Sequence, residues 1–146
     1  MSFPVVGVGA SAGGLEAFSE LLANLPTDTG MAFLLVQHLD PTHGSFLVEI
    51  LSKQTGMPIE EAREGIEILP DHVYVLPPNN MLTVVGNRLH LTSRETTEQR
   101  RSPVDILFDS LAERGLNAVG VILSGSGSDG AKGVQTLKEA GGIIFA

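Results

Sequence analysis

Near its start the chain reads Pro4-Val5-Val6-Gly7-Val8-Gly9-Ala10-Ser11-Ala12-Gly13-Gly14. The apolar, β-branched part predicts a strand over Pro4–Val8. Leucine and phenylalanine then recur at helical spacing, which predicts a helix from Gly13 to Asn24 that Pro26 stops. The glycines between strand and helix permit a tight turn. This stretch therefore predicts the first strand–turn–helix unit of an α/β fold.

The same alternation of strand and helix patterns continues along the chain. Apolar runs predict further strands at Met31–Val36, Ile59–Ala62, Val73–Leu76, Ala118–Leu123 and from Ile143 onward. Helical spacing predicts helices at Ser45–Gln54, Val104–Arg114 and Ala131–Ala140. The Gly86-Asn87 pair predicts a hairpin turn between Met81–Val85 and Arg88–Thr92. The charged stretch Glu95–Arg101 predicts an exposed loop.

This order of elements predicts a doubly wound α/β fold of the Rossmann-like kind. We expect a mostly parallel sheet with helices on both faces and one antiparallel hairpin. The strands are apolar throughout, as strands covered on both faces should be. The 146 residues suffice for one domain, 1–146. Because the chain stops inside the last predicted strand, we expect this domain to be trimmed at its C-terminal end.

Composition excludes several classes of function. The net charge of −8 argues against a nucleic-acid partner, which requires a basic face. No apolar run approaches the roughly 20 residues that cross a bilayer, and no signal peptide is recognisable, so we expect a cytoplasmic protein without membrane insertion. The absence of cysteine rules out disulfides and thiol catalysis. His38 and His43 lack the spacing and companions of a metal site, so we expect no metal and no cofactor.

Three motifs follow three of the predicted strands. They supply Ser11 after the first strand, His38 after the second, and Asp129 in the glycine-rich segment after Ala118–Leu123. If these strands are parallel neighbours, the three side chains meet at one edge of the sheet, where open α/β sheets keep their active sites. A serine nucleophile, a histidine base and an orienting aspartate form the triad of a serine hydrolase.

Each motif also has a simpler interpretation when it is taken alone. The segment Gly7–Gly14 resembles a dinucleotide fingerprint with alanine in the third glycine place, and alone it favours nucleotide binding or a plain turn. That fingerprint requires an acidic residue at the end of the second strand, where this chain has Gln37-His38 with Asp40 just beyond.

The histidine and the aspartate have comparable alternatives. A single histidine at a strand end, such as His38, is more often structural, and Asp129 could cap the helix that follows it. The serine loop and the dense glycines around Asp129 shift both interpretations toward catalysis. For His72 and His90 the sequence identifies no partner.

Together the motifs resemble a known family. Gly-Ala-Ser-x-Gly-Gly, Gln-His and Gly-x-Gly-x-Asp-Gly-Ala-x-Gly are similar, in order and spacing, to the catalytic domain of CheB-type chemotaxis receptor methylesterases. The likeness runs from Val5 to Ile143-Ile144 and is strongest to the N-terminal domain of methylesterase–methyltransferase (CheB/CheR) fusions. It implies a doubly wound α/β domain acting in chemotaxis or related two-component signalling, with sensor and methyltransferase modules downstream.

The resemblance also implies a reaction and its residues. The family hydrolyses γ-glutamyl methyl esters on the cytoplasmic helical domain of chemoreceptors, and many members deamidate glutamines. Carried over, Ser11 is the nucleophile, His38 the general base and acid, and Asp129 the residue that orients His38. A carboxylic ester hydrolase with a methylated chemoreceptor as partner is therefore the expected function.

Three positions depart from the family pattern. Ala12 replaces a hydroxyl residue, Ser126 replaces a methionine, and Asn79-Asn80-Met81 stands where the family often has a histidine. These changes leave Ser11, His38 and Asp129 in place, but they affect the expected catalytic efficiency and the expected fit of the substrate. They support an alternative, a catalytically degenerate regulatory domain of a sensory protein. A nucleotide-binding module that uses Gly7–Gly14 is the third hypothesis.

Overall fold

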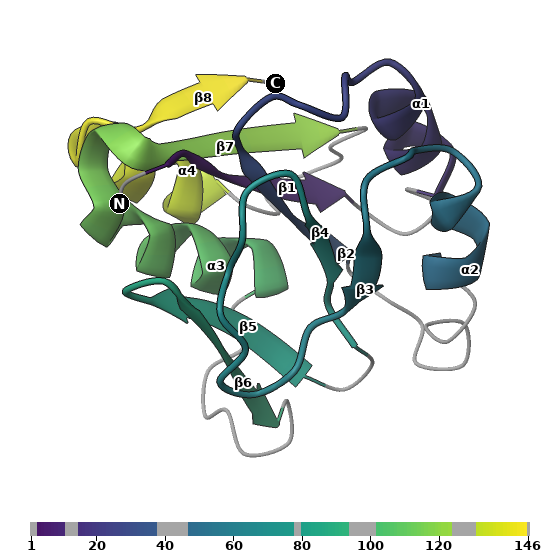
Figure 1. The fold of residues 1–146 in the computed structure, drawn as a ribbon. Helices are drawn as coiled ribbons and strands as arrows, with labels where there is room; N and C mark the ends of the chain where they lie inside the picture. The colour runs from purple at the N-terminus through teal and green to yellow at the C-terminus, as the bar shows by residue number, and fades with distance from the viewer. Residues whose placement is uncertain are drawn as a thin grey trace.

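The computed structural model describes residues 3–10, 15–37, 47–77, 80–93, 102–123 and 131–145 (Figure 1). In chain order the elements are β1 (Val5–Ala10), α1 (Leu15–Ala23), β2 (Ala32–Gln37), α2 (Leu47–Ser52), β3 (Ile59–Glu61), β4 (Val73–Val75), β5 (Asn80–Val85), β6 (Arg88–Ser93), α3 (Pro103–Leu111), the 3₁₀ segment η3 (Ala112–Asn117), β7 (Ala118–Leu123), α4 (Ala131–Glu139) and β8 (Ile143–Phe145). The predicted loop Glu95–Arg101 lies outside the described residues.

The strands form a parallel sheet and a separate hairpin. The six-stranded sheet has the order β3-β4-β2-β1-β7-β8, and every pair in it is parallel. β5 and β6 pair antiparallel around Gly86-Asn87, which confirms the predicted hairpin. Every residue of β1 and β2 is buried, as expected of central strands with helices on both faces.

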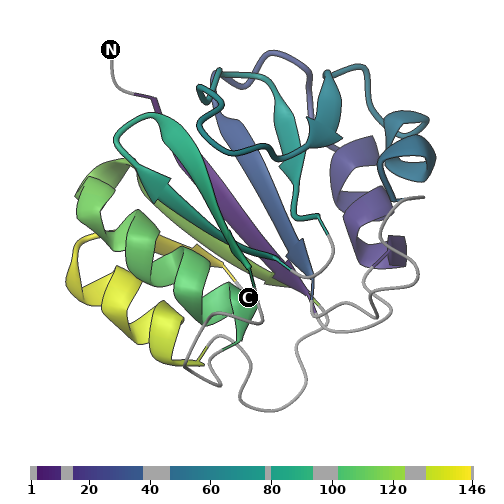
Figure 2. The same ribbon diagram turned by 90° about the horizontal axis from the view of Figure 1, so that it is seen from below.

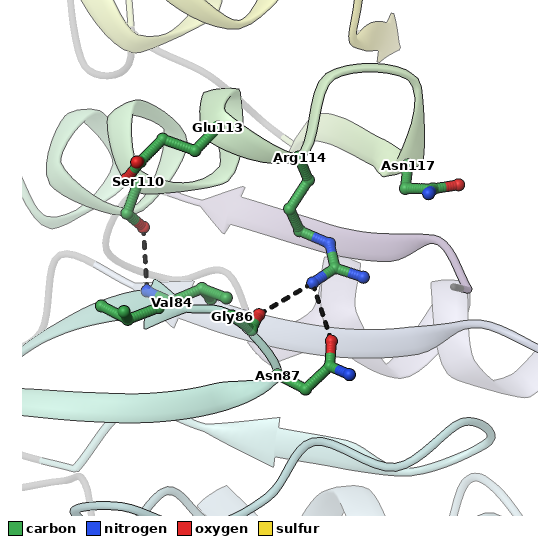
Figure 3. Close-up of a pocket in the computed structure, with 8 residues that line it drawn as sticks. Val84, Gly86, Asn87, Ser110, Glu113, Arg114 and Asn117 are labelled. Carbon is green, nitrogen blue, oxygen red and sulfur yellow. Dashed lines mark hydrogen bonds between the residues drawn. The ribbon is translucent and has the colours of Figure 1, made fainter. Parts of the chain in front are cut away.

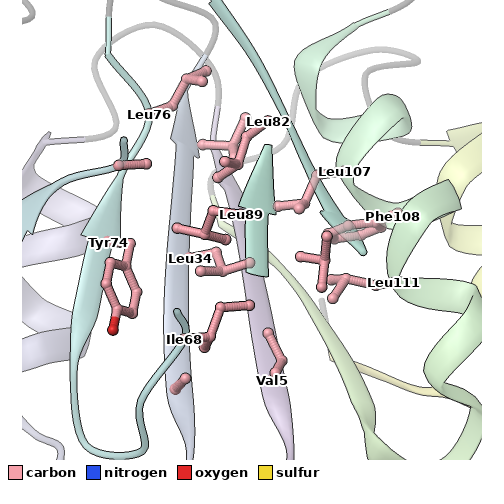
Figure 4. Packing of buried hydrophobic residues seen from close by; sticks show 14 of the residues in the cluster. Val5, Leu34, Ile68, Tyr74, Leu76, Leu82, Leu89, Leu107, Phe108 and Leu111 are labelled. Atoms are coloured by element: carbon pink, nitrogen blue, oxygen red, sulfur yellow. The ribbon is translucent and has the colours of Figure 1, made fainter. Parts of the chain in front are cut away.

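Helices cover both faces of the sheet, so the predicted doubly wound fold is confirmed. α1 and α2 lie on one face, while α3, α4 and the hairpin lie on the other (Figure 2). Successive residues of β1 alternate between the two layers, because side chains of a strand point to opposite faces in turn. Val5 packs with Leu82, Leu89 and Phe108 in the core of the hairpin and α3 (Figure 4).

β1 approaches α3 so closely that it carries glycine at two positions on that face. A Cβ atom at Gly9 would lie 2.7 Å from both methyl carbons of Val104, and one at Gly7 would lie 2.7 Å from Cδ1 of Leu111. A real Cβ atom almost never comes within 3.0 Å of another heavy atom. The two glycines therefore set the distance between the central strand and α3.

Most element ends differ from the sequence prediction by one or a few residues, and the differences at β1, β2 and α3 have a clear cause. β1 and β2 run beyond their predicted ends, to Ala10 and Gln37, because these two residues pair with each other in the ladder. The helix predicted to reach Arg114 ends as an α-helix at Leu111 and continues as η3. Gly115 turns the chain there with a φ of 59°, a conformation that favours glycine, and leads it into β7.

Candidate functional site

Three neighbouring strands end at the same level of the sheet. Ala10, the last residue of β1, pairs with Gln37 at the end of β2 and with Leu123 at the end of β7. In the sequence, Ser11 follows Ala10, His38 follows Gln37, and Asp129 lies in the segment that joins Leu123 to α4. Ser11, His38 and Asp129 themselves lie outside the described residues. The structure thus brings together the three strand ends that carry them.

These strand ends flank the point where the chain changes direction across the sheet. From β1 the chain passes to β2, β3 and β4 on one side, and after the hairpin and α3 it places β7 on the other side. In open α/β sheets, ligands bind outside the carboxyl ends of the strands at such a switch point. The first expectation about the site, one shared sheet edge, is therefore confirmed for the strands.

Two buried polar side chains lie close to this edge, and the sequence prediction included neither as a site residue. Gln37 is 7% exposed and Asp105 is 8% exposed. Asp105 lies in the first turn of α3, where its N–H donates to Oγ of the capping Ser102 at 3.0 Å. The Ser-x-x-Asp spacing of a helix start, and a polar residue closing an apolar strand, are the signals that mark them.

The glycine pattern that resembled a nucleotide fingerprint has another cause. Gly7 and Gly9 lie inside β1, where α3 fills the space that side chains would need. In a dinucleotide site, the glycines instead form the turn after the strand and let the phosphates approach the backbone. β2 also ends in Gln37 rather than in an acidic residue. The described residues therefore give no support to the nucleotide-binding hypothesis.

Two histidines outside the proposed triad, His72 and His90, have partners among the described residues. Nδ1 of His90 lies 2.8 Å from Oε2 of Glu64, and Nδ1 of His72 lies 2.8 Å from the carbonyl oxygen of Pro70. The Leu91 N–H donates to Oε1 of Glu64. This bond, with the smaller effect of His90, lowers the pKa of Glu64. The sequence alone identified neither partner, and the structure places both in the connection between β3 and β4.

A pocket lies at the opposite, amino-terminal edge of the sheet. Its volume is about 430 Å³, and it opens between the hairpin turn and the corner where α3 passes into η3 (Figure 3). The Arg114 guanidinium crosses it and donates to the carbonyl oxygen of Gly86 at 2.9 Å and to Oδ1 of Asn87 at 3.1 Å. A third bond, 2.8 Å long, reaches the carbonyl oxygen of Phe3. Partial burial lowers the pKa of Arg114.

Comparison with known proteins identifies the family. The family model described as CheB methylesterase matches residues 6–146. This chain belongs to the CheB methylesterase family. The CheB match runs from the second residue of β1 through β8 and includes the three strand ends of the candidate site.

CheB relatives and a CheB structure resemble the chain over almost its full length. A protein-glutamate methylesterase/protein-glutamine glutaminase of Photorhabdus laumondii is 39% identical over 97% of this chain and 42% of its own length. A Burkholderia pseudomallei protein of the same name is 38% identical over 95% of this chain and 39% of its own. The chain thus spans about two fifths of these relatives.

The structural comparison agrees with the sequence comparison. The crystal structure of the Thermotoga maritima CheB methylesterase catalytic domain superposes with a TM-score of 0.87, at 28% identity, covering all of this chain and 80% of that one. The predicted fold and family are therefore confirmed. No helix in the described ranges is both long and apolar enough to cross a lipid bilayer.

The positions that depart from the CheB pattern lie mostly in undescribed segments. Ala12, Ser126 and Asn79 fall outside the described residues. Asn80 is the first residue of β5 and pairs with Ser93, and Met81 after it is buried. The stretch Asn79-Asn80-Met81, where the family often has a histidine, therefore coincides with the start of the hairpin strand β5 at Asn80.

Proposed function

We propose that this chain is a protein-glutamate methylesterase that hydrolyses γ-glutamyl methyl esters on chemoreceptors. Membership of the CheB methylesterase family and the names of the relatives support the reaction class. The register of the sheet carries the proposal: Ala10 pairs with both Gln37 and Leu123, so the chain segments with Ser11, His38 and Asp129 all start from one edge. Adjacent strands are about 4.8 Å apart, which suits side chains that must exchange a proton.

The proposed mechanism has two chemical steps. Ser11 Oγ attacks the ester carbonyl carbon while His38 takes the hydroxyl proton. The tetrahedral intermediate collapses, the bond to the methoxy oxygen breaks, and His38 protonates the departing methoxide to methanol. Water then attacks the glutamyl–serine ester, giving its proton to His38, which returns a proton to Ser11 Oγ as glutamate leaves. Asp129 holds His38 in the required tautomer and stabilises its protonated form.

The substrate class and the partners are part of the proposal. The partner is the methylated cytoplasmic helical domain of a chemoreceptor. Glutamine deamidation uses the same acyl-enzyme, with ammonia leaving in place of methanol. The likeness to methylesterase–methyltransferase fusions, with sensor modules downstream and a cytoplasmic location, stays a prediction that the size and fractionation of the native polypeptide test.

Release of labelled methanol tests this function. The 146-residue protein is incubated with chemoreceptor membranes carrying tritiated methyl esters, beside Ser11→Ala and Ser52→Ala variants. Ser52 is an exposed serine of α2, which makes it a matched control. We expect Ser11→Ala to lose at least about a thousandfold in turnover and Ser52→Ala to match the wild type.

A fluorophosphonate probe separates the alternatives. Labelling that Ser11→Ala abolishes and Ser52→Ala retains supports Ser11 as the nucleophile. Methanol release that persists in Ser11→Ala contradicts the proposed triad. A wild-type protein that neither releases methanol nor takes the label supports the degenerate regulatory domain instead.

A further inference from the structure

The pocket at the amino-terminal edge of the sheet has the size of a site for a small molecule. Its volume of about 430 Å³ falls within the roughly 300–1,000 Å³ of most ligand pockets. One wall is the hairpin turn around Gly86, and the other is formed by the end of α3 and by η3 (Figure 3). The strand ends proposed to carry the hydrolysis lie at the other edge of the sheet.

The positive charge of Arg114 has no counter-charge among the described residues. Its hydrogen bonds go to the carbonyl oxygens of Gly86 and Phe3 and to Oδ1 of Asn87, which are all neutral acceptors. The five N–H groups of the guanidinium make only these three bonds, and the Nε–H is buried with no acceptor in the part of the chain that the structure describes. Taking a charge partly out of water is unfavourable unless it is paired. The guanidinium therefore retains capacity for an anionic partner.

Glu113 brings a negative charge to the same pocket. It precedes Arg114 directly, and consecutive residues of a helical segment do not face each other. Figure 3 shows the Glu113 side chain extending toward Ser110, while the Arg114 guanidinium reaches the hairpin turn. Glu113 is exposed, and within the described ranges it forms no ion pair. The pocket thus holds one cation and one anion that are kept apart.

The remaining walls of the pocket add one free amide and one aliphatic side chain. Asn117, the last residue of η3, lines the pocket, and its side chain makes no hydrogen bond with the described residues. Val85 is an exposed aliphatic residue just before the hairpin turn. Oγ of Ser110 is already engaged, since it accepts from the Val84 N–H and donates to the Leu107 carbonyl oxygen.

We propose that this pocket binds a free amino acid with an aliphatic side chain, in its zwitterionic form. The carboxylate accepts hydrogen bonds from the Arg114 guanidinium, and the ammonium group donates to the Glu113 carboxylate. The aliphatic side chain packs against Val85. A ligand with a carboxylate alone is repelled by Glu113, and one with an amine alone is repelled by Arg114, so a ligand with both charges fits best.

Calorimetric titration of the 146-residue protein with L-valine at pH 7 tests this site. Two control ligands keep the carbon skeleton of valine and remove one charge each. Isovalerate lacks the ammonium group, and isobutylamine lacks the carboxylate. We expect saturable binding of L-valine and at least about tenfold weaker binding of either control, because hydrogen bonds between charged groups are the strong ones.

Two variants assign the charges. Glu113→Gln should weaken L-valine binding at least about tenfold and should not weaken isovalerate binding, because it removes only the partner of the ammonium group. Arg114→Lys should weaken binding of both ligands, since an ammonium cannot reproduce the planar fork. Glu49→Gln and Arg63→Ala change exposed residues outside the pocket and should match the wild type. If Arg114→Lys does not fold, Glu113→Gln decides alone.

Nuclear magnetic resonance locates the bound ligand. L-valine should shift the backbone amide signals of residues 84–87 and 110–117 and leave those of residues 47–61 unchanged. Shifts confined to residues outside the pocket would overturn the proposal.

Three results of the titrations would also overturn it. They are the absence of saturable L-valine binding, an unchanged L-valine affinity in Glu113→Gln, and binding of isovalerate or inorganic phosphate at least as tight as that of L-valine, which would indicate a simple anion site. None of these measurements depends on ester hydrolysis, so the amino-acid site and the methylesterase function stand or fall separately.

Discussion

Gly9 of β1 lies directly beneath Val104 of α3, and a Cβ atom at Gly9 would come within 2.7 Å of both Val104 methyl carbons. Val104 is β-branched, so its side chain has a single strongly preferred χ1 in a helix and cannot turn away. The contact lies one residue before the end of β1, next to the proposed Ser11 link. Packing between the central strand and α3 therefore leaves no room for a side chain right beside the candidate site.

This contact predicts a graded cost of adding a methyl group to β1. Gly9→Ala should destabilise the protein by about 1–3 kcal/mol, the usual cost of overpacking a core. Gly7→Ala should cost less, because its nearest neighbour is the terminal Cδ1 of Leu111, the mobile end of a flexible side chain. Urea unfolding at equilibrium measures both.

A second substitution tests the cause. In a Gly9→Ala, Val104→Ala double variant, the space opened at position 104 should recover part of the loss, so the two changes should cost less together than the sum of each alone. Strictly additive costs would show that the Val104 contact is not the source of the destabilisation.

Arg114 predicts a stability effect at the other edge of the sheet. Its guanidinium joins the hairpin turn to Phe3, two residues before β1, through three hydrogen bonds, and it lies 5.7 Å from the Phe3 ring centre. Arg114→Ala should lower the free energy of unfolding by about 1–3 kcal/mol, because it leaves these acceptors without a charged donor. Arg114→Lys should not restore it, since an ammonium cannot reproduce the planar fork.

The matched control for Arg114 is Arg63→Ala. Arg63 forms an exposed pair with Glu60 three residues away, and such pairs contribute between 0 and about 1 kcal/mol. Equal effects of Arg63→Ala and Arg114→Ala in urea unfolding would contradict the special role of Arg114.

Glu64 predicts a specific dependence of stability on pH. Its pKa is lowered in the folded protein, first by the Leu91 N–H and then by His90. A carboxyl with a depressed folded pKa contributes stability that is fully present above its unfolded pKa, about 4.5, and is lost as the pH falls through the folded pKa. The thermal midpoint of Glu64→Gln should therefore lie below that of the wild type at pH 7, and the gap should close in acid.

Thermal unfolding between pH 7 and pH 3 measures this gap. Glu49→Gln, an exposed change on α2, serves as the control and should show little difference from the wild type at any pH in this range. A Glu64→Gln gap that stays constant or widens in acid would contradict the assignment of the lowered pKa to the Leu91 and His90 contacts.

Local patterns in the sequence were sufficient to predict most of the fold. β7 and β8 lie where apolar runs predicted them, and Ser102-Pro103 starts α3 as its capping signal indicates. The ends of β1 and β2 were predicted short, because they depend on pairing between Ala10 and Gln37 rather than on either segment alone. The 3₁₀ segment was missed because the positive φ of Gly115 is imposed by the approach to β7.

For the candidate site, the sequence predicts a chemistry, but it does not indicate which residues support the site. The strand-end motifs pointed to Ser11, His38 and Asp129, and these assignments stay predictions because all three lie outside the described residues. The burial of Gln37 and Asp105, and the partners of Arg114, depend on segments distant in the sequence that only tertiary packing brings together. Gly7 and Gly9 also depend on tertiary packing. Their spacing in the sequence resembles a nucleotide-binding pattern, but in the structure α3 packs against both residues.

The pairing of β1 with β7 also determines how early during synthesis the central sheet can form. Val5 pairs with Ala118, so the central strand stays open along one edge until β7 has been synthesised. Contacts between residues so distant in sequence form late, because a long loop must close before they are made. A growing chain therefore carries the segments with Ser11 and His38 long before the segment with Asp129 has a strand to follow. Under the proposed function, hydrolysis should therefore not begin before β7 has been made and has paired with β1.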